Sequence, residues 1–119
     1  MSRTRVYIIV AVVAIFAIGG GYIVYRSSGG GGQNVTIDVT VTGADSMTPV
    51  HLTARQNDTV TINMKSDTDG EVHLHGYDIP FDTKAGQTVS HTFKADKTGT
   101  FEIEWESTST HLGDLSVNP

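Results

Sequence analysis

The sequence predicts an all-β sandwich of about seven strands, preceded by one N-terminal transmembrane helix. Apolar and polar residues alternate through most of positions 34–119, which is the period of a strand with one buried face. Val, Ile and Thr dominate these segments, and clusters of Asn, Asp and Gly separate them. No stretch beyond residue 26 has a helical period. Two antiparallel sheets packed face to face would bury one face of every strand.

Seven segments share this alternation and are the expected strands. They are residues 35–42, 50–54, 59–64, 72–75, 88–93, 101–106 and 112–117. Turn signals rich in Asp, Asn and Gly lie between several of them, at 56–58, 67–70, 85–87 and 97–99.

Residues 6–25 form an uncharged run that is long enough to cross a hydrocarbon core of about 30 Å as a helix. Arg3 and Arg5 precede the run, which favours a cytoplasmic stub at 1–5 and an extracytoplasmic C-terminal domain. A cleaved signal peptide is the alternative, with Ala17 and Gly19 as a small-x-small cleavage site. Because the apolar run continues through Tyr25, we expect a single-pass anchor in the cell membrane. The glycine- and serine-rich residues 26–33 then form a flexible linker to the domain at 34–119.

The charge of the domain limits its partners. Residues 33–119 hold 13 acidic and five basic residues, a net charge of −8 with histidine neutral. Such a surface argues against nucleic acid and against lying flat on anionic lipid. It suits a cationic partner or a metal ion, although solubility explains it equally well. The chain has no cysteine, so the domain must fold without disulfides.

His73 and His75 form a His-x-His pair on one expected strand. Side chains two residues apart emerge on the same face, roughly 7 Å apart. The pair could offer two imidazoles to one metal ion, or it could be an ordinary hydrogen-bonded pair, and Tyr77 would extend its face. Which face that is stays open, because Val72 and Leu74 alternate with the histidines. The set that faces the core separates a metal site from a surface pair.

The last twenty-one residues have a recognisable pattern of a strand, a short loop with a histidine, and a closing strand. The pattern G-x-[FY]-x-x-x-C-x-x-H-x-x-M-x-G-x-[LV]-x-V fits without a gap at Gly99, Phe101, Gly113, Leu115 and Val117. On these residues, 33–119 resembles the cupredoxin family, of the plastocyanin, amicyanin and cytochrome oxidase subunit II type. The resemblance implies a Greek-key β-sandwich and copper as the cofactor.

The copper ligands of that family are only partly present. Trp105 falls on the cysteine, Thr108 on the loop histidine, His111 on the axial methionine and His73 on the upstream histidine. A blue-copper centre requires the thiolate, so copper here would need nitrogen and oxygen ligands. The metal ligands that the resemblance implies are His73 and His111, joined by His75, and Trp105 would form a dry wall of the site.

Two carboxylates could complete this ligand set, Glu106 and Asp78. The alternation along 101–106 places Glu102, Glu104 and Glu106 opposite the apolar residues, so we expect these three glutamates to face solvent. His51 and His91 are expected to be ordinary surface residues of their strands.

The sequence therefore predicts a membrane-anchored, extracytoplasmic copper-binding domain that holds the ion or exchanges it with a metal donor or acceptor protein. A metal-free, tethered interaction module is the alternative, with Trp105 filling the metal cavity. Electron transfer ranks last because the thiolate is missing. No enzymatic activity is expected, because the chain has neither a nucleophile motif nor a facing pair of carboxylates.

Overall fold

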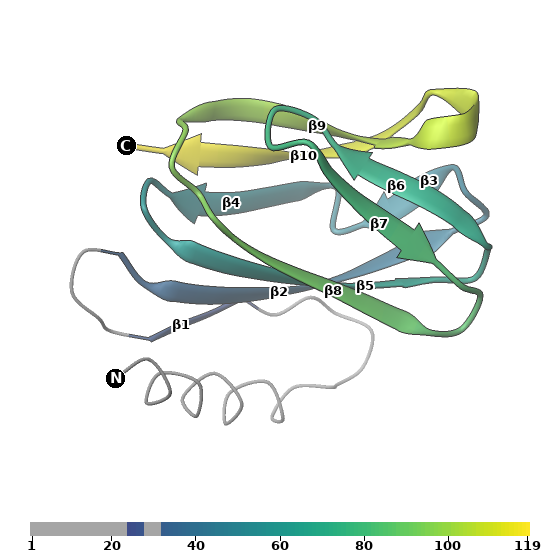
Figure 1. Ribbon diagram of the computed structural model, residues 1–119, viewed down its shortest axis with the longest axis horizontal. Coiled ribbons are helices and arrows are strands. Elements are labelled where there is room, and N and C mark those ends of the chain that lie inside the picture. The colour runs from purple at the N-terminus through teal and green to yellow at the C-terminus, as the bar shows by residue number, and fades with distance from the viewer. Residues whose placement is uncertain (1–23, 28–31) are drawn as a thin grey trace.

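The computed structural model describes residues 24–27 and 32–119, which form two sheets that face each other (Figure 1). The first sheet contains β1 (Val24–Ser27), β2 (Asn34–Thr42), β5 (Thr59–Ser66) and β8 (Thr88–Lys94) in that order, with β3 (Ser46–Thr48) paired to β2. The second sheet has the order β4 (His51–Arg55), β10 (Thr110–Asn118), β9 (Gly99–Trp105), β6 (Gly70–Leu74) and β7 (Ile79–Thr83). A 3-10 turn, η2 (Glu106–Thr108), joins β9 to β10. The prediction of an all-β, two-sheet architecture is confirmed.

The sheets are mixed, whereas the sequence predicted antiparallel ones. β2 pairs with β5 in parallel, and β4 pairs with β10 in parallel; the other pairs are antiparallel. The cause is that the chain leaves the first sheet after β3, forms β4 in the second sheet, and then returns to lay β5 beside β2. Alternation of residues along a strand carries no information about the direction of its neighbour.

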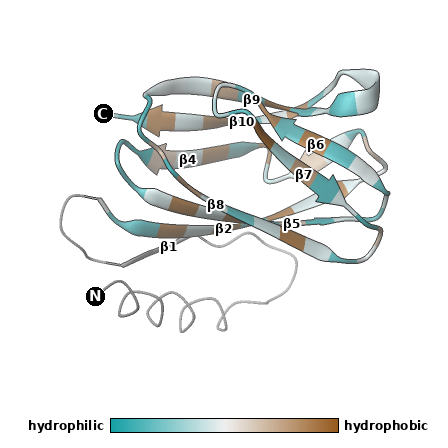
Figure 2. Ribbon diagram, viewed as in Figure 1, coloured by the Kyte–Doolittle hydropathy of each residue, from teal (hydrophilic) through white to brown (hydrophobic). Residues whose placement is uncertain are grey.

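The core lies between the sheets and comes from alternate residues of each strand. Figure 2 shows apolar and polar bands alternating along the strands of both sheets. In the first sheet, Val35, Ile37, Val60 and Ile62 are almost completely buried. The second sheet contributes fully buried side chains from every strand to the same core cluster: Leu52, Leu115, Ile103, Leu74 and Phe81. At about 25 cal/mol per Å² of buried apolar surface, this layer is the main stabilising contribution to the fold.

Three of the strands were not expected. β3 is very short, and β7 contains Pro80 and Asp82, which are uncommon in strands. β1 takes two residues from the end of the expected anchor and two from the start of the expected linker, and pairs them with β2. The expected cytoplasmic stub, the rest of the anchor and half of the linker, at 1–23 and 28–31, lie outside the described residues. Within 24–27 and 32–119, no helix is long and apolar enough to span a membrane.

Candidate metal centre

Three neighbouring strands of the second sheet bring the predicted histidines together. His73 on β6 lies opposite Glu104 on β9, and Glu104 lies opposite His111 on β10. His75 follows β6 directly, and its backbone N–H donates a 2.9 Å hydrogen bond to the carbonyl of Glu102. The register of the sheet therefore gathers all three histidines on one part of its surface.

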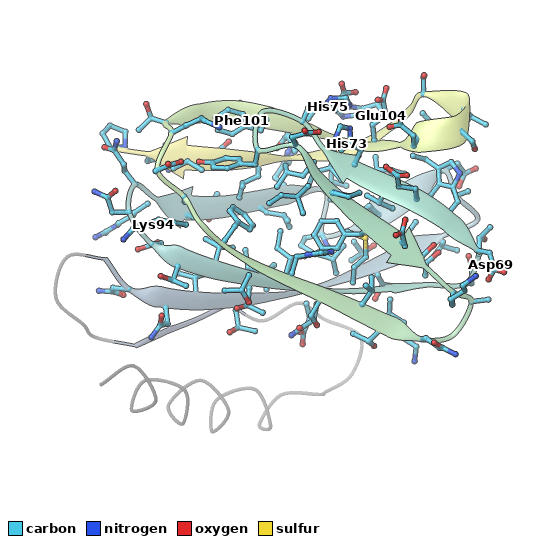
Figure 3. The ribbon with its side chains drawn as sticks, viewed as in Figure 1. Asp69, His73, His75, Lys94, Phe101 and Glu104 are labelled. Carbon is cyan, nitrogen blue, oxygen red and sulfur yellow. The ribbon has the colours of Figure 1, made fainter. Side chains whose placement is uncertain are left out.

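The histidines lie on the outer face of the second sheet. Val72 and Leu74 are fully buried, so His73 and His75, which alternate with them, point the other way. Figure 3 shows His73, His75 and Glu104 together on the side of this sheet that faces away from the first sheet. The question that the sequence left open is thus resolved in favour of the surface, the face that the sequence associated with a surface pair rather than with a metal site.

Glutamates of β9 are the nearest partners of two of these histidines. His75 Nε2 lies 2.7 Å from Glu104 Oε1, and His111 Nδ1 lies 3.0 Å from Glu102 Oε2. Because a carboxylate can only accept, the imidazole is the donor in each hydrogen bond. The ligand atoms of His75, Glu102 and Glu104 all lie within 4.8 Å of one another. These three residues form the most compact donor group of the face.

His73 has a different environment from His75, although their ring centroids are only 4.5 Å apart. Its Nε2 lies 2.8 Å from Asp78 Oδ1. Its Nδ1 is buried and has no hydrogen-bond partner among the described residues, and the nearest carboxylate oxygen, Glu106 Oε1, is 3.6 Å away. The side chain as a whole is 19% exposed. His73 therefore has one ring nitrogen whose hydrogen-bonding capacity is unused.

The carboxylates raise the pKa of His75 above its usual value near 6.5. The hydrogen bond to Glu104 is the main cause, the charges of Glu104, Glu102 and Glu106 add to it, and partial burial opposes it. A metal ion binds the neutral imidazole, so a proton and a metal ion compete for this nitrogen.

Trp105 does not line this site, contrary to the sequence prediction. It is 4% exposed and lies opposite Val72 in the register, so it points into the core while His73 points outward. Its ring lies against Gly70, where an added Cβ would be only 2.3 Å from Trp105 Cζ2. Thr108, at the position of the family's loop histidine, is exposed in η2. Its hydroxyl forms a 2.6 Å hydrogen bond with the hydroxyl of Thr110. Because side chains alternate along β9, Trp105, at the position of the family's cysteine, lies on the opposite face of the sheet from the three histidines.

Other sequence predictions about this face had mixed outcomes. Glu102 and Glu104 do lie opposite the buried positions of β9, as predicted, although the Glu104 side chain is only 17% exposed. Glu106 is exposed but begins η2, so the predicted strand ends one residue earlier. The role of Glu102 and Glu104 as partners of the histidines was missed, because it depends on the register between strands. The two carboxylates that the sequence did single out, Asp78 and Glu106, both lie beside His73. Tyr77 does not extend the histidine face; it packs on Phe93 and Phe101 and accepts a hydrogen bond from the Lys97 N–H.

The two remaining histidines are far apart in the fold. His51 lies on β4, in the same sheet as the predicted ligands, with Nδ1 2.9 Å from Asp114 Oδ1. His91 lies on β8 in the first sheet, opposite the buried Ile62, and its half-buried ring packs edge-on against the buried Phe81. The prediction that His91 is an ordinary surface residue was therefore wrong.

The fold is shared with solved copper proteins. No family model and no curated protein matches the sequence. A heme-copper terminal oxidase structure matches 98% of this chain and 90% of its own chain, with 12% identity and a TM-score of 0.65. The metal-binding domain of the Streptococcus pneumoniae Cu(I)-exporting P-type ATPase CopA, solved with Cu(I), matches 85% of this chain and 100% of its own chain, with 16% identity and a TM-score of 0.65. A copper binding protein in the apo form matches 87% of this chain and 100% of its own chain, with 15% identity and a TM-score of 0.60. The chain therefore has a cupredoxin-like fold.

The donor set of this chain does not fit the blue-copper centre that the fold is known for. No cysteine is present, and a buried tryptophan occupies the corresponding position. The outer face of the second sheet instead offers imidazole nitrogens and carboxylate oxygens, which are ligands for Cu(II) and other first-row divalent ions.

Proposed function

We propose that this domain binds a Cu(II) ion on the outer face of its second sheet and holds it for exchange with a partner protein. The observation that carries the proposal is the donor group of His75, Glu102 and Glu104, with ligand atoms within 4.8 Å of one another. Bonds from imidazole and carboxylate to such ions are about 2 Å long, so small side-chain movements would let all three reach one ion. His73 and His111 flank the group and can complete the set.

Copper is favoured over the other divalent ions by the chemistry of these donors. Affinity of a nitrogen and oxygen site rises along the first-row series to a maximum at Cu(II), and Cu(II) accepts a tetragonal arrangement of such ligands. The solved structures that share the fold include copper proteins, which supports the same choice.

The oxidised ion is favoured over Cu(I), which prefers sulfur ligands. The chain has no cysteine, and Met47 and Met64 are buried in the core, away from the outer face.

The exposure of the donors suits an exchange site. The side chains of His75 and His111 are 43% and 59% exposed, so a ligand of a second protein can approach the ion directly. We propose a carrier role rather than catalysis. We further propose that residues 6–25 anchor the chain in the cell membrane with the domain on the extracytoplasmic side; the uncharged run and the preceding arginines support this placement.

A metal-free interaction module is the competing function, and two observations favour it. Trp105 fills the place of the copper-ligating cysteine, and each histidine of the outer face already has a carboxylate within hydrogen-bond distance. In that case, changing His73 or His111 to Ala would lower the melting temperature equally with and without copper.

Calorimetric titration of the full-length protein in detergent with Cu(II) tests the proposal. We expect His75→Ala to weaken binding at least about tenfold, since a direct ligand is lost, while changing the melting temperature of the apo protein little. His91→Ala is the matched control, because His91 lies on the other sheet and should leave copper binding unchanged. Equal copper binding by the wild type and both variants would contradict the proposal.

A further inference from the structure

We infer that Asn57 is a site of N-linked glycosylation, at which an oligosaccharide is joined to the side-chain amide nitrogen. The segment Asn57-Asp58-Thr59 has the sequence Asn-x-Ser/Thr, without proline in the middle, that accepts such glycans in exported proteins. This inference rests on one part of the proposed function, the extracytoplasmic placement of the domain, and not on copper binding.

The acceptor lies in the turn between β4 and β5, where the fold exposes its side chain. The Asp58 N–H donates a 3.1 Å hydrogen bond to the Arg55 carbonyl, which closes the turn. Asn57 is the third residue of this turn and has φ of +74°, a conformation that asparagine adopts more readily than most residues. Its backbone N–H donates to the Ala95 carbonyl at 2.8 Å, so the main chain is held while the side chain is exposed.

A sugar on this side chain would displace nothing that holds the fold. Within 24–27 and 32–119, the side-chain amide of Asn57 forms no hydrogen bond. By contrast, Asp58 is 1% exposed, and its carboxylate accepts hydrogen bonds from the N–H groups of Gln33 and Arg55. The transferase must therefore read the segment during export, before the turn forms, and the folded domain then tolerates the product.

The transfer needs an oligosaccharide carried on a lipid pyrophosphate as the donor and a membrane-bound transferase as the catalyst. The amide nitrogen of Asn57 forms a bond to the anomeric carbon of the sugar, and the bond between that carbon and the lipid pyrophosphate breaks. The amide loses one proton, and the lipid pyrophosphate is the leaving group. A chain that is exported through the same membrane meets both the donor and the enzyme.

The other asparagines of the domain lack either the acceptor sequence or the room. Asn34 also begins an Asn-x-Thr sequence, but it is half-buried at the start of β2, between β1 and β5. Asn63 begins no such sequence, and both ends of its side chain are hydrogen bonded. Asn118 precedes proline. Because a glycan is bulky, the folded domain accommodates it best at Asn57.

A glycan at this turn would leave the proposed copper site open. The turn lies at the end of the sandwich where the chain terminates, and η2 lies at the other end (Figure 1). Lys94, which is opposite Thr59 in the register, is well separated from His75 and Glu104 in Figure 3. Loss of the glycan should therefore leave copper affinity unchanged.

Mass spectrometry of the full-length protein, purified from the membranes of its native host, tests the inference. Trypsin releases residues 56–65 as one peptide, which contains Asn57 but not Asn34. We expect this peptide to carry a sugar mass that fragmentation assigns to Asn57. Thr59→Ala should remove the sugar completely while leaving the acceptor in place, and the matched control Thr59→Ser should keep it. Asn57→Asp, which tolerates the same turn conformation, should also remove it.

The outcomes separate this inference from the proposed function. An unmodified 56–65 peptide, from a domain that protease degrades on intact cells, would overturn the glycosylation and leave the extracytoplasmic placement standing. A sugar that persists in Thr59→Ala and in Asn57→Asp would overturn it as well. A domain that protease reaches only after cell lysis would overturn both the placement and the glycosylation, while copper binding is tested by its own titration.

Discussion

His75 is the residue on which the chemistry of the outer face depends most. It belongs to the compact donor group, it contacts Glu104 at 2.7 Å, and its ring lies beside that of His73. Its pKa is raised, chiefly by the hydrogen bond to Glu104. A raised pKa means that the folded protein binds the proton of His75 more tightly than the unfolded chain does. The resulting stabilisation is complete below pH 6.5 and is lost as the pH rises through the folded-state pKa.

The shifted pKa of His75 predicts where copper affinity falls. Because protonated imidazole cannot bind metal, affinity should decline as the pH drops through a value above 6.5. Glu104→Gln removes the main cause of the shift, so the pKa of His75 should move back toward its usual value. Nuclear magnetic resonance of the imidazole carbons against pH measures both midpoints in the apo protein. The same midpoint in the variant and the wild type would mean that Glu104 does not set this pKa.

Trp105 should matter for stability and not for copper. Its ring is buried on the opposite side of the sheet from His73, so Trp105→Phe leaves the donor face intact. The lost volume should lower the free energy of unfolding by roughly 1–3 kcal/mol. Chemical denaturation measures the first effect, and calorimetric titration with Cu(II) measures the second. A changed copper affinity in the folded variant would place the ion near Trp105 instead.

At the scale of elements, the turn after β6 positions His75 through a close backbone contact. Gly76 has φ of +86°, and an added Cβ would lie 2.2 Å from Phe101 Cδ1. Gly86 has a similar φ of +80° but open space around it. Both Gly→Ala changes incur the left-handed backbone penalty of about 1–2 kcal/mol. Gly76→Ala should cost roughly 1–3 kcal/mol more, because Phe101 must move.

Urea denaturation of the Gly76→Ala and Gly86→Ala variants isolates that packing contribution as the difference between them. Equal free energies of unfolding would show that Phe101 yields without cost and that the turn is not held by this contact.

The strands with strong alternation could be predicted from the sequence to within a few residues, and those without it could not. β5 was expected at 59–64 and spans Thr59–Ser66. β7 was missed because Pro80 and Asp82 weaken its local preference, and it forms by pairing with β6. Parallel pairing was missed for a related reason, since strand direction is set by the path of the chain between sheets.

The candidate site was predictable in its histidines but not in its geometry. The spacing of His73 and His75 placed them on one face, and the structure confirms that. The choice of face depended on which of the alternating residues the second sheet buries. The partnership with Glu102 and Glu104 depended on the registers of β9 with β6 and with β10, which no local pattern encodes.

At the scale of the whole molecule, the two outer faces differ in chemistry. The outer face of the first sheet is rich in hydroxyl and amide groups, with contacts such as Thr61 to Thr92 and Ser90 to Asn63. The outer face of the second sheet carries the paired histidines and carboxylates. Metal ions should therefore gather on one side of the domain only.

The proposed membrane anchor is also a property of the whole chain. If residues 6–25 span the bilayer, the full-length protein should stay in the membrane pellet after extraction at alkaline pH, and a variant that begins at residue 26 should not. Protease added to intact cells should degrade the domain if it lies outside. Release of the full-length protein by the extraction would contradict the anchor.

The position of bound copper tests the central claim most directly. A crystal of the copper-loaded protein, measured on both sides of the copper absorption edge, would locate the ion by its anomalous signal. We predict a peak on the outer face of the second sheet, between His75, Glu104 and Glu102. A peak in the interior beside Trp105, or no peak at the outer face, would contradict this structure of the site.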